Sequence, residues 1–379
     1  MPGQTTKAEI QTECFPRIRF PLPRTHHRDY YPSSTALPLV VMKNLIVFFS
    51  LMILLSPVGS AQSRSQEVAT PADVKPGSIT CEECPYPYPS SYLPLTLYGQ
   101  DVRMAYMDVA PKGQPNGHTV VLLHGNNFAG FYFGVVIDAL REEGFRVIVP
   151  DQIGYGRSSK PIIPYYLADM ARNTRAILQS LNINQAMIVG HSMGGMLAAR
   201  FATQYPGVTE RLVLFNPIGL TDTRFSNPAG DPDEAYKRNL ASTYQTIRAS
   251  LMRYVAHKPS AWNSQFESYV RIRYAWTLSA DWPRLARVQT LINSLINLDP
   301  VVYDWAHIQS PTLVYGGAED MLAGTPAAFQ EGMKRIAATI PNGKAHLQLL
   351  PGLGHVPFIE APERSLPPLV AFLKEGLTK

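Results

Sequence analysis

The sequence predicts an α/β protein with a mostly parallel central sheet, helices on both faces and one inserted helical segment. Runs of unbroken valine, isoleucine and leucine alternate with helix-like segments, which is typical of parallel strands buried on both faces. The alternation stops over residues 218–305 and then resumes. This indicates one sheet domain into which residues 218–305 are inserted. The apolar runs are TVVLLHG (119–125), FRVIVPD (145–151), QAMIVGHS (185–192), RLVLFNP (211–217), PTLVYGGAED (311–320) and HLQLLPGLGH (346–355).

The other elements complete one sheet domain over residues 93–379. LTLYG (95–99) and VRMAYMDVA (102–110) predict an antiparallel pair that opens the domain. The segment at about 218–305, with many Arg, Tyr and Trp residues, predicts a helical cap. Amphipathic or small-residue helices are expected at 132–144, 167–181, 194–205, near 325–340 and at 361–376.

Residues 1–61 predict an N-terminal extension with a secretory signal peptide. A basic start at Met42 precedes the apolar run LIVFFSLMILL (45–55), and small residues precede the expected cleavage point before Gln62. These are the features of a signal peptide. We therefore expect translation to start at Met42 and the product to be periplasmic or secreted. The alternative is a retained membrane anchor, although the run is shorter than the roughly 20 residues that a spanning helix needs.

Residues 62–92 are rich in Pro, Ser and Gln and predict an extended arm over the domain. With Cys14 in the front segment, the arm holds the two other cysteines, Cys81 and Cys84. In an oxidising compartment a local disulfide is expected, and the alternative is no special role. A redox pair is disfavoured because PYPYPSSY (85–92) follows where that motif needs a helix. A zinc site would need two further ligands nearby, so neither a metal nor a cofactor is expected.

The charge balance argues against nucleic-acid binding. The chain has a formal net charge of +5, and removing residues 1–61, with six Lys/Arg and three Asp/Glu, lowers it to +2. A chain whose positive and negative charges nearly balance, and which has no basic cluster, lacks the sequence features of nucleic-acid binding. A small molecule is the expected partner, and no stable membrane anchor is expected after signal cleavage.

The stretch VGHSMGG (189–195) carries the strongest chemical signal. A strand that turns at once into a helix passes through one strained residue, and side chains two positions before and after it would collide. Gly190 and Gly194 meet this requirement, and the turn lifts Ser192 clear of the sheet. The G-x-S-x-G motif alone is weak, but here a buried strand meets a small-residue helix. We therefore predict Ser192 as a nucleophile, with the Met193 N–H directed toward any oxygen that forms there.

A serine hydroxyl needs a base, and the base needs a group that orients it. His355 follows the last apolar run on a glycine-bearing loop, at the sheet edge where catalytic groups collect. It is the expected base. Asp320 is the expected orienting acid because its short carboxylate suits an imidazole on the next loop, and Glu319 is the alternative. An acid after the earlier strand is disfavoured because Asn216 stands there. The order Ser, Asp, His is that of one known triad type.

The turn HGNN (124–127) follows the first buried strand and predicts a site for an oxyanion. The amide of Asn126 is expected to face the nucleophile, and one such donor typically contributes about 3–4 kcal/mol to transition-state stabilisation. His124 is expected to bond the loop backbone, Asp151 to anchor the next loop, and His191 to point away from the serine side chain.

Five motifs in this order carry a resemblance: LLHGN (122–126), PDQIGYGRSSKP (150–161), VGHSMGG (189–195), YGGAED (315–320) and GLGHVPF (352–358). Together they resemble the α/β-hydrolase superfamily over about residues 93–379. The resemblance implies an α/β-hydrolase fold with a helical cap at about 218–305. It also implies a serine hydrolase with Ser192, Asp320 and His355 as its triad and no cofactor.

The same motifs restrict the activities that the resemblance allows. Epoxide hydrolases and haloalkane dehalogenases are similar in layout but use an aspartate nucleophile, so Ser192 argues against both. Met193 stands where proline iminopeptidases usually have tryptophan, which argues against an aminopeptidase. The resemblance favours a carboxylesterase-like enzyme. Carbon–carbon bond hydrolase, lactonase and amidase are the alternatives on the same triad. A non-catalytic binding protein is disfavoured because all three triad residues are present.

Aromatic residues after the oxyanion turn predict the substrate pocket. In FAGFYF (128–133), Phe128, Phe131 and Tyr132 are expected to line an apolar pocket between cap and sheet. A medium-sized hydrophobic or aromatic ester would fit such a pocket. The cap tryptophans could add to the lining, although a place in the core of the cap is favoured for each of them: Trp262, Trp276, Trp282 and Trp305.

Overall fold

The computed structural model divides the chain into two units, Met1–Arg64 and Ser65–Lys379, and describes residues 68–377. The predicted signal peptide, the start at Met42 and the first part of the predicted arm lie outside the described residues. Within residues 68–377, no helix combines the length and the apolar character needed to cross a membrane.

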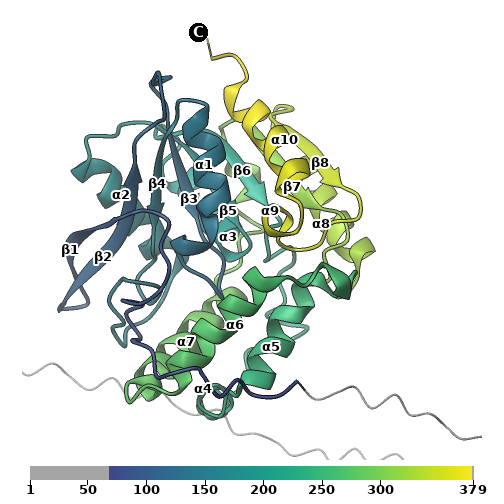
Figure 1. Ribbon diagram of the computed structural model, residues 1–379. Helices are drawn as coiled ribbons and strands as arrows, with labels where there is room; N and C mark the ends of the chain where they lie inside the picture. Colours follow the sequence, from purple (N-terminus) through teal and green to yellow (C-terminus); the bar gives the residue numbers. More distant parts are fainter. Residues whose placement is uncertain (1–67, 378–379) are drawn as a thin grey trace, which may run out of the picture. The chain divides into compact units, whose positions relative to one another are not determined.

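An eight-stranded sheet forms the centre of the described unit, in the order β1-β2-β4-β3-β5-β6-β7-β8 (Figure 1). β1 and β2 form an antiparallel hairpin, and β2 pairs with β4 in the same sense. All other neighbouring strands are parallel, which confirms the predicted sheet. The strands are β1 (Ser90–Leu97), β2 (Gln100–Val109), β3 (Thr119–Leu123), β4 (Arg146–Pro150), β5 (Ala186–His191), β6 (Thr209–Phe215), β7 (Thr312–Gly317) and β8 (Ala345–Leu350).

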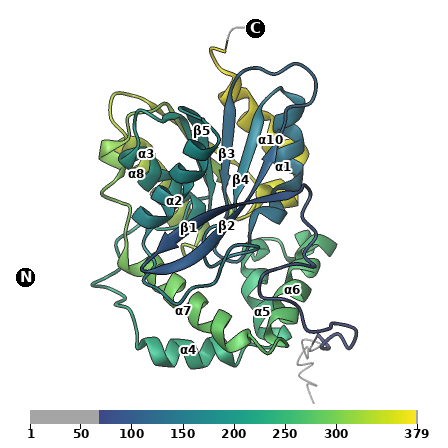
Figure 2. The same cartoon turned by 90° about the vertical axis from the view of Figure 1, so that its left-hand side faces the viewer.

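Each face of the sheet has its own hydrophobic core, because successive side chains of a strand point to opposite faces. In β3, Val120 and Leu122 belong to one core, and Val121 and Leu123 belong to the other. Figure 2 shows α1 and α10 over the first face and α2, α3 and α8 over the second. These helices are α1 (Gly134–Glu142), α2 (Leu167–Ser180), α3 (Met193–Gln204), α8 (Pro326–Thr339) and α10 (Pro362–Lys374).

The segment between β6 and β7 folds into a helical cap. Hydrogen-bonding side chains mark where its helices begin. Thr243 Oγ1 accepts from the Thr246 N–H, and Asn263 Oδ1 accepts from the Gln265 N–H, each at a helix start. The cap elements are α4 (Pro232–Leu240), α5 (Tyr244–Met252), η2 (Arg253–Val255), η3 (Pro259–Ala261), α6 (Ser264–Thr277), α7 (Trp282–Leu298) and η4 (Trp305–His307).

The tryptophans of this segment serve mainly as core. Trp276, Trp282 and Trp305 are buried within the hydrophobic cores. Trp262 stacks on Phe266 with ring centroids 5.4 Å apart. Of these four, Trp276 alone lines one of the two cavities described below.

The first strand begins earlier than the sequence indicates. Residues 90–94, SSYLP, belong to β1, although their composition predicts part of the arm. Pro94 is tolerated there because β1 is the edge strand of the sheet, where a missing N–H breaks no central ladder. Residues 68–89 contain neither helix nor strand.

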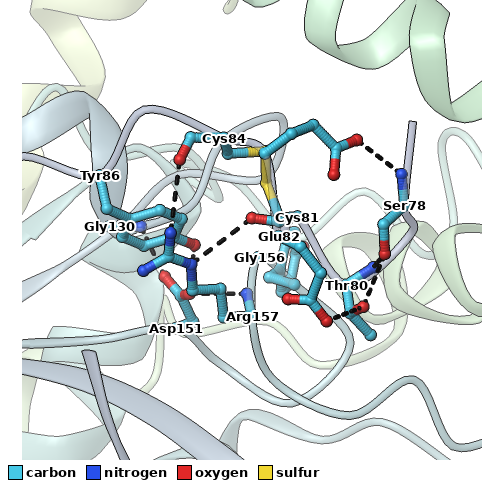
Figure 3. Close-up of a disulfide and its surroundings, with 12 residues drawn as sticks. Ser78, Thr80, Cys81, Glu82, Cys84, Tyr86, Gly130, Asp151, Gly156 and Arg157 are labelled. Atoms are coloured by element: carbon cyan, nitrogen blue, oxygen red, sulfur yellow. Dashed lines mark hydrogen bonds between the residues drawn. A yellow bond between two sulfur atoms is a disulfide. The ribbon is translucent and has the colours of Figure 1, made fainter. Parts of the chain in front are cut away.

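Cys81 and Cys84 form a disulfide within the arm (Figure 3). Both residues are buried, and their carbonyl oxygens each accept from the Arg157 guanidinium at 3.5 Å. The guanidinium lies 3.9 Å above the Tyr86 ring, and the Tyr86 hydroxyl donates to the Asp151 carboxylate. The arm is thereby fixed to the loop that follows β4.

Candidate active site

Ser192 stands at the turn between β5 and α3, where its φ of 59° is strained for a residue with a Cβ. A Cβ on Gly190 would lie 2.0 Å from the Gly194 carbonyl oxygen, and a Cβ on Gly194 would lie 2.0 Å from the Leu123 carbonyl oxygen. Neither position can hold a larger residue without a backbone shift. The turn therefore has the packing that the G-x-S-x-G spacing predicts.

His355 lies between Ser192 and Asp320. Its Nδ1 is 2.6 Å from Asp320 Oδ2, and its Nε2 is 2.9 Å from Ser192 Oγ. Because a carboxylate only accepts, Nδ1 carries the hydrogen, and Nε2 of the neutral ring accepts from the serine hydroxyl. His355 and Asp320 are fully buried, whereas Ser192 is 5% exposed. The structure thus brings the three predicted side chains together at the ends of their strands.

The surroundings of Asp320 favour its ionised form. Burial alone would raise the pKa of Asp320, but the contact with His355 and further donors hold it below its ordinary value. The Leu322 N–H donates to Oδ1 at 2.9 Å, and the Asn216 amide donates to Oδ2 at 2.9 Å. The His355 ring bonds this acid and not the alternative, Glu319.

Glu360, which sequence analysis did not single out, holds the loop that carries His355. It ends the short helix α9 (Pro357–Glu360), and its carboxylate accepts from the Gly354 N–H at 3.0 Å and the Val356 N–H at 3.2 Å. Burial raises the pKa of Glu360, and His257 of the cap lies 3.4 Å from its carboxylate. In the sequence, nothing distinguishes a glutamate five residues after the histidine from the acidic residues on the surface of any other helix.

The loop after β3 lies directly over the nucleophile. A Cβ on Gly125 would be 3.0 Å from Ser192 Cβ and 3.4 Å from Ser192 Oγ. The neighbouring Asn126 N–H and the Met193 N–H at the start of α3 have no backbone acceptor within residues 68–377. Both amides are therefore free for an oxygen bonded near the serine. The Asn126 side chain donates to Asn293 of α7 at 2.7 Å, which ties this loop to the cap.

The other polar residues of these loops make structural hydrogen bonds. His124 Nδ1 donates to the Gly125 carbonyl at 2.9 Å, and its Nε2 accepts from the Gln152 N–H at 3.1 Å, so His124 bonds the loop backbone as expected. Asp151 accepts from the Gly130 N–H at 2.7 Å and anchors the loop after β4. Within the described part of the chain, no group of three or more His, Cys, Asp or Glu side chains is placed to hold a metal ion.

A cavity of about 720 Å³ opens beside Ser192, between the sheet edge and the cap. Polar groups occupy the end near the nucleophile, where Asn126, Asp320 and Tyr254 line it. The remaining wall combines apolar residues with polar and charged ones, among them Arg253, Glu331 and Arg335, and its apolar part can hold a medium-sized apolar group next to the hydroxyl. Its apolar lining includes Ile218, Leu220, Ile296, Leu322 and Phe329.

The predicted pocket residues do not line this cavity, and that prediction was wrong. Phe131 and Tyr132 are buried in the hydrophobic core, and Phe128 lines a different, smaller cavity. The reason is local: residues 130–133 form a short 3-10 helix (η1), which turns its aromatic rings toward the core. The Phe128 and Tyr132 rings stack there with centroids 4.6 Å apart.

The smaller cavity, of about 60 Å³, is lined by a half-buried arginine with one buried N–H group that has no acceptor among the described residues. It shares Asn126 and Asn127 with the large cavity, and Arg273 of α6 lines it. Arg273 Nη1 is buried and has no hydrogen-bond acceptor among the described residues, and burial lowers the pKa of the guanidinium. Lys160 also lines this cavity, but its ammonium donates to backbone carbonyls, including that of Gly156 at 2.7 Å. The Trp276 Nε1–H, which also lines this cavity, likewise has no acceptor among the described residues, so the unused donors here are one cationic group and one indole N–H.

The sheet, the serine turn and the hydrogen-bonded histidine and aspartate define a hydrolase-type α/β protein. The chain belongs to the alpha/beta hydrolase family, whose pattern matches residues 120–366.

Three similar proteins are named as hydrolases or hydrolytic enzymes. The chain is similar to a solved structure titled a "probable hydrolytic enzyme" from Pseudomonas aeruginosa PAO1, with 37% identity and a TM-score of 0.74 over 79% of this chain and 99% of that one. It is 29% identical to the "Putative carbamate hydrolase RutD" of Serratia proteamaculans (strain 568), over 63% of this chain and 85% of that protein. It is 36% identical, over 33% of this chain and 43% of that protein, to a 2-hydroxy-6-oxononadienedioate/2-hydroxy-6-oxononatrienedioate hydrolase of Paraburkholderia phymatum. These similarities support a hydrolase.

Proposed function

We propose that this protein is an exported serine hydrolase that cleaves carboxylic esters through an acyl-enzyme. The observation that supports this most directly is the continuous hydrogen bonding from Asp320 through His355 to Ser192, with bonds of 2.6 and 2.9 Å. The two free amides beside the hydroxyl add the second requirement of acyl transfer, which is a place for negative charge.

In this mechanism Ser192 attacks the ester carbonyl carbon while His355 Nε2 takes the hydroxyl proton. Asp320 stabilises the resulting imidazolium, since burial makes an unpaired cation costly. The amides of Asn126 and Met193 hold the oxyanion of the tetrahedral intermediate. His355 then gives the proton to the departing alcohol, and a water activated by the same ring releases the acid.

The volume of the large cavity and the apolar part of its lining support a medium-sized hydrophobic or aromatic group on the substrate. Its volume of about 720 Å³ falls within the range of small-molecule sites. Its apolar wall is built by the loops after β6 and β7 together with α7 and α8, so elements of both cap and sheet select the substrate.

Replacing the nucleophile tests the proposal. Ser192→Ala should abolish hydrolysis of a nitrophenyl ester and labelling by a fluorophosphonate probe. Ser180→Ala is the matched control, because Ser180 is an exposed residue at the end of α2 whose hydroxyl, within residues 68–377, bonds the Ile177 carbonyl alone. Near-normal turnover by folded Ser192→Ala protein, or no labelling of the wild type, would rule the mechanism out.

Export is supported by the sequence of residues 1–61 and by the disulfide of Cys81 and Cys84, which suits an oxidising compartment. The test is fractionation of cells that express the full chain with a C-terminal tag, followed by N-terminal sequencing of the product. A periplasmic or secreted form that begins at Gln62 is expected. A form that stays in the membrane with residues 45–55 intact would contradict export with cleavage.

A second candidate, carbon–carbon bond hydrolysis of an anionic substrate, is favoured by Arg273. A half-buried guanidinium whose buried Nη1 is an unused donor beside the oxyanion loop is suited to a carboxylate on the substrate. The Paraburkholderia phymatum relative is named for a dioate, which is a dicarboxylate. In this reading the same serine acts on a vinylogous diketone that bears a carboxylate.

Paired substrates separate the two candidates. Wild-type kcat/KM is compared for a neutral nitrophenyl ester, a nitrophenyl half-ester of a dicarboxylic acid, and a carboxylate-bearing vinylogous diketone. If Arg273 binds the carboxylate, Arg273→Leu lowers kcat/KM at least 10-fold for the anionic substrates alone. Arg271→Leu is the matched control, since Arg271 lies on the same helix but pairs with Asp73. Preference for the neutral ester, unchanged in Arg273→Leu, would exclude the second candidate.

A further inference from the structure

His191 is the centre of a hydrogen-bonded chain beside the proposed triad. It ends β5, directly before Ser192, and is fully buried. Its Nε2 lies 2.8 Å from the His355 carbonyl oxygen, and its Nδ1 lies 2.9 Å from the Tyr132 hydroxyl. The Tyr132 oxygen accepts from the Gly125 N–H at 2.9 Å. The chain therefore joins the loop of the base to the loop that lies over the nucleophile.

The groups at its ends determine which atom donates at each step. A carbonyl oxygen only accepts, so Nε2 of His191 carries a hydrogen. A neutral imidazole has a single N–H, so Nδ1 accepts from the Tyr132 hydroxyl, which is left to accept from Gly125. Burial, with a smaller contribution from His355, lowers the pKa of His191 to about 3, so the ring is neutral at pH 7. In this arrangement the His355 carbonyl, the His191 ring, the Tyr132 hydroxyl and the Gly125 N–H each have a hydrogen-bond partner.

Aromatic packing holds the chain in place. The His191 ring lies against Phe358, with centroids 5.1 Å apart, and against Phe215, with centroids 5.9 Å apart. Tyr132 stacks on Phe128 and also contacts Phe358 edge-on, at 5.3 Å. Neither side chain can move far without disturbing the core.

We propose that His191 and Tyr132 are positioning residues that set the oxyanion loop relative to the base. This inference rests on the proposed function. Tyr132 holds the Gly125 amide, and the next amide along the chain, that of Asn126, is the proposed oxyanion donor. Because such donors act most strongly in the transition state, their misplacement lowers kcat with little change in KM.

Tyr132→Phe removes only the hydroxyl at the centre of the proposal. The expected result is a fall in kcat of about 10-fold or more for a nitrophenyl ester, with KM within about twofold, because one oxyanion donor is worth roughly 100- to 1,000-fold. The inhibition constant of a trifluoromethyl ketone, which forms a tetrahedral adduct with a serine, should rise by the same factor as kcat/KM falls.

Tyr315→Phe is the matched control. The Tyr315 hydroxyl is also buried and donates to the Ser365 carbonyl at 2.7 Å, away from the oxyanion loop. This variant should lose a similar amount of thermal stability and keep its kcat and inhibition constant. If Tyr132→Phe behaves in the same way, Tyr132 serves stability alone and the inference is overturned.

Two variants of His191 extend the test. His191→Gln keeps an N–H that can reach the His355 carbonyl, whereas His191→Phe keeps the ring volume without donor or acceptor. The expected order of kcat is wild type, then Gln, then Phe. Equal activity of all three folded proteins would contradict the inference.

Labelling by a fluorophosphonate separates failure of the inference from failure of the proposed function. If the wild type is not labelled, the serine mechanism itself is wrong. If the wild type and Tyr132→Phe are labelled at the same rate, the mechanism stands and the positioning role is excluded. Slower labelling of Tyr132→Phe, with the labelling rate of Tyr315→Phe unchanged, supports both the serine mechanism and the positioning role of Tyr132.

Discussion

The Asn216 side chain donates to Asp320 Oδ2 at 2.9 Å, and its own Oδ1 accepts from the Gly317 N–H at 2.9 Å. Asn216 follows β6 and Asp320 follows β7, so one amide joins the ends of two neighbouring strands. Asn216 has a φ of 40°, in the left-handed region that asparagine tolerates better than most residues. Asn216, which stands where an acid after β6 was disfavoured, thus fixes Asp320, the acid that follows β7.

Removing this amide should impair the triad. In Asn216→Ala, Asp320 loses a donor to its charged oxygen, and such a bond is worth about 1.5–3 kcal/mol. We expect kcat/KM for a nitrophenyl ester to fall by about 10-fold or more. Asn216→Gly serves as the companion variant, because glycine accepts the positive φ without strain. Loss of activity in Ala but not in Gly would assign the effect to the backbone and contradict a role for the amide.

The sequence predicted the parts of the site that depend on local geometry. Gly190 and Gly194 are required by contacts within one turn, so the spacing around Ser192 is visible in the chain itself. Asp320 and His355 follow apolar runs, and the ends of parallel strands meet at one sheet edge. The sheet order that brings them together is a property of the fold class.

The parts that the sequence did not predict depend on contacts between distant elements. Glu360 bonds backbone N–H groups of the His355 loop, and Asn216 bonds the Asp320 carboxylate. No residue spacing in the sequence predicts these hydrogen bonds. The aromatic run after the oxyanion turn predicted a pocket, but a 3-10 helix directs Phe131 and Tyr132 into the core. The pocket wall comes from the loops after β6 and β7 together with α7 and α8, and its residues share no sequence pattern.

Gly190→Ala should strongly destabilise the fold. The added Cβ would meet the Gly194 carbonyl at 2.0 Å and the Ala198 side chain at 2.7 Å, so the start of α3 must shift. We expect a loss of about 3 kcal/mol or more in the free energy of unfolding, measured by chemical denaturation. Gly207→Ala is the matched control, since among the described residues, its chain neighbours aside, none places an atom within 4 Å of its Cβ position. Equal stability of the two variants would show that the elbow tolerates a side chain.

Opening the disulfide should cost stability without affecting catalysis. Cys81 and Cys84 close a short loop, for which the chain-entropy relation gives about 2 kcal/mol. The double variant Cys81→Ser/Cys84→Ser should therefore unfold at lower denaturant concentration and keep kcat within about twofold. Dithiothreitol should destabilise the wild type by a similar amount and leave the variant unchanged. An effect of the reductant on the variant would point to a target other than this disulfide.

The buried His191 should make the protein sensitive to acid. Burial lowers its pKa from the ordinary value of 6.5 to about 3, so the unfolded chain binds a proton at a pH where the folded protein does not. The stabilising contribution is complete above pH 6.5 and is lost as the pH falls toward 3, with a slope of up to about 1.4 kcal/mol per pH unit. In His191→Gln this contribution is absent. His124, whose pKa burial also lowers, is present in both proteins and cancels in the comparison. Denaturation measured between pH 7 and pH 4 should therefore give a steeper loss of stability for the wild type. Parallel curves would show that folding does not lower the pKa of His191.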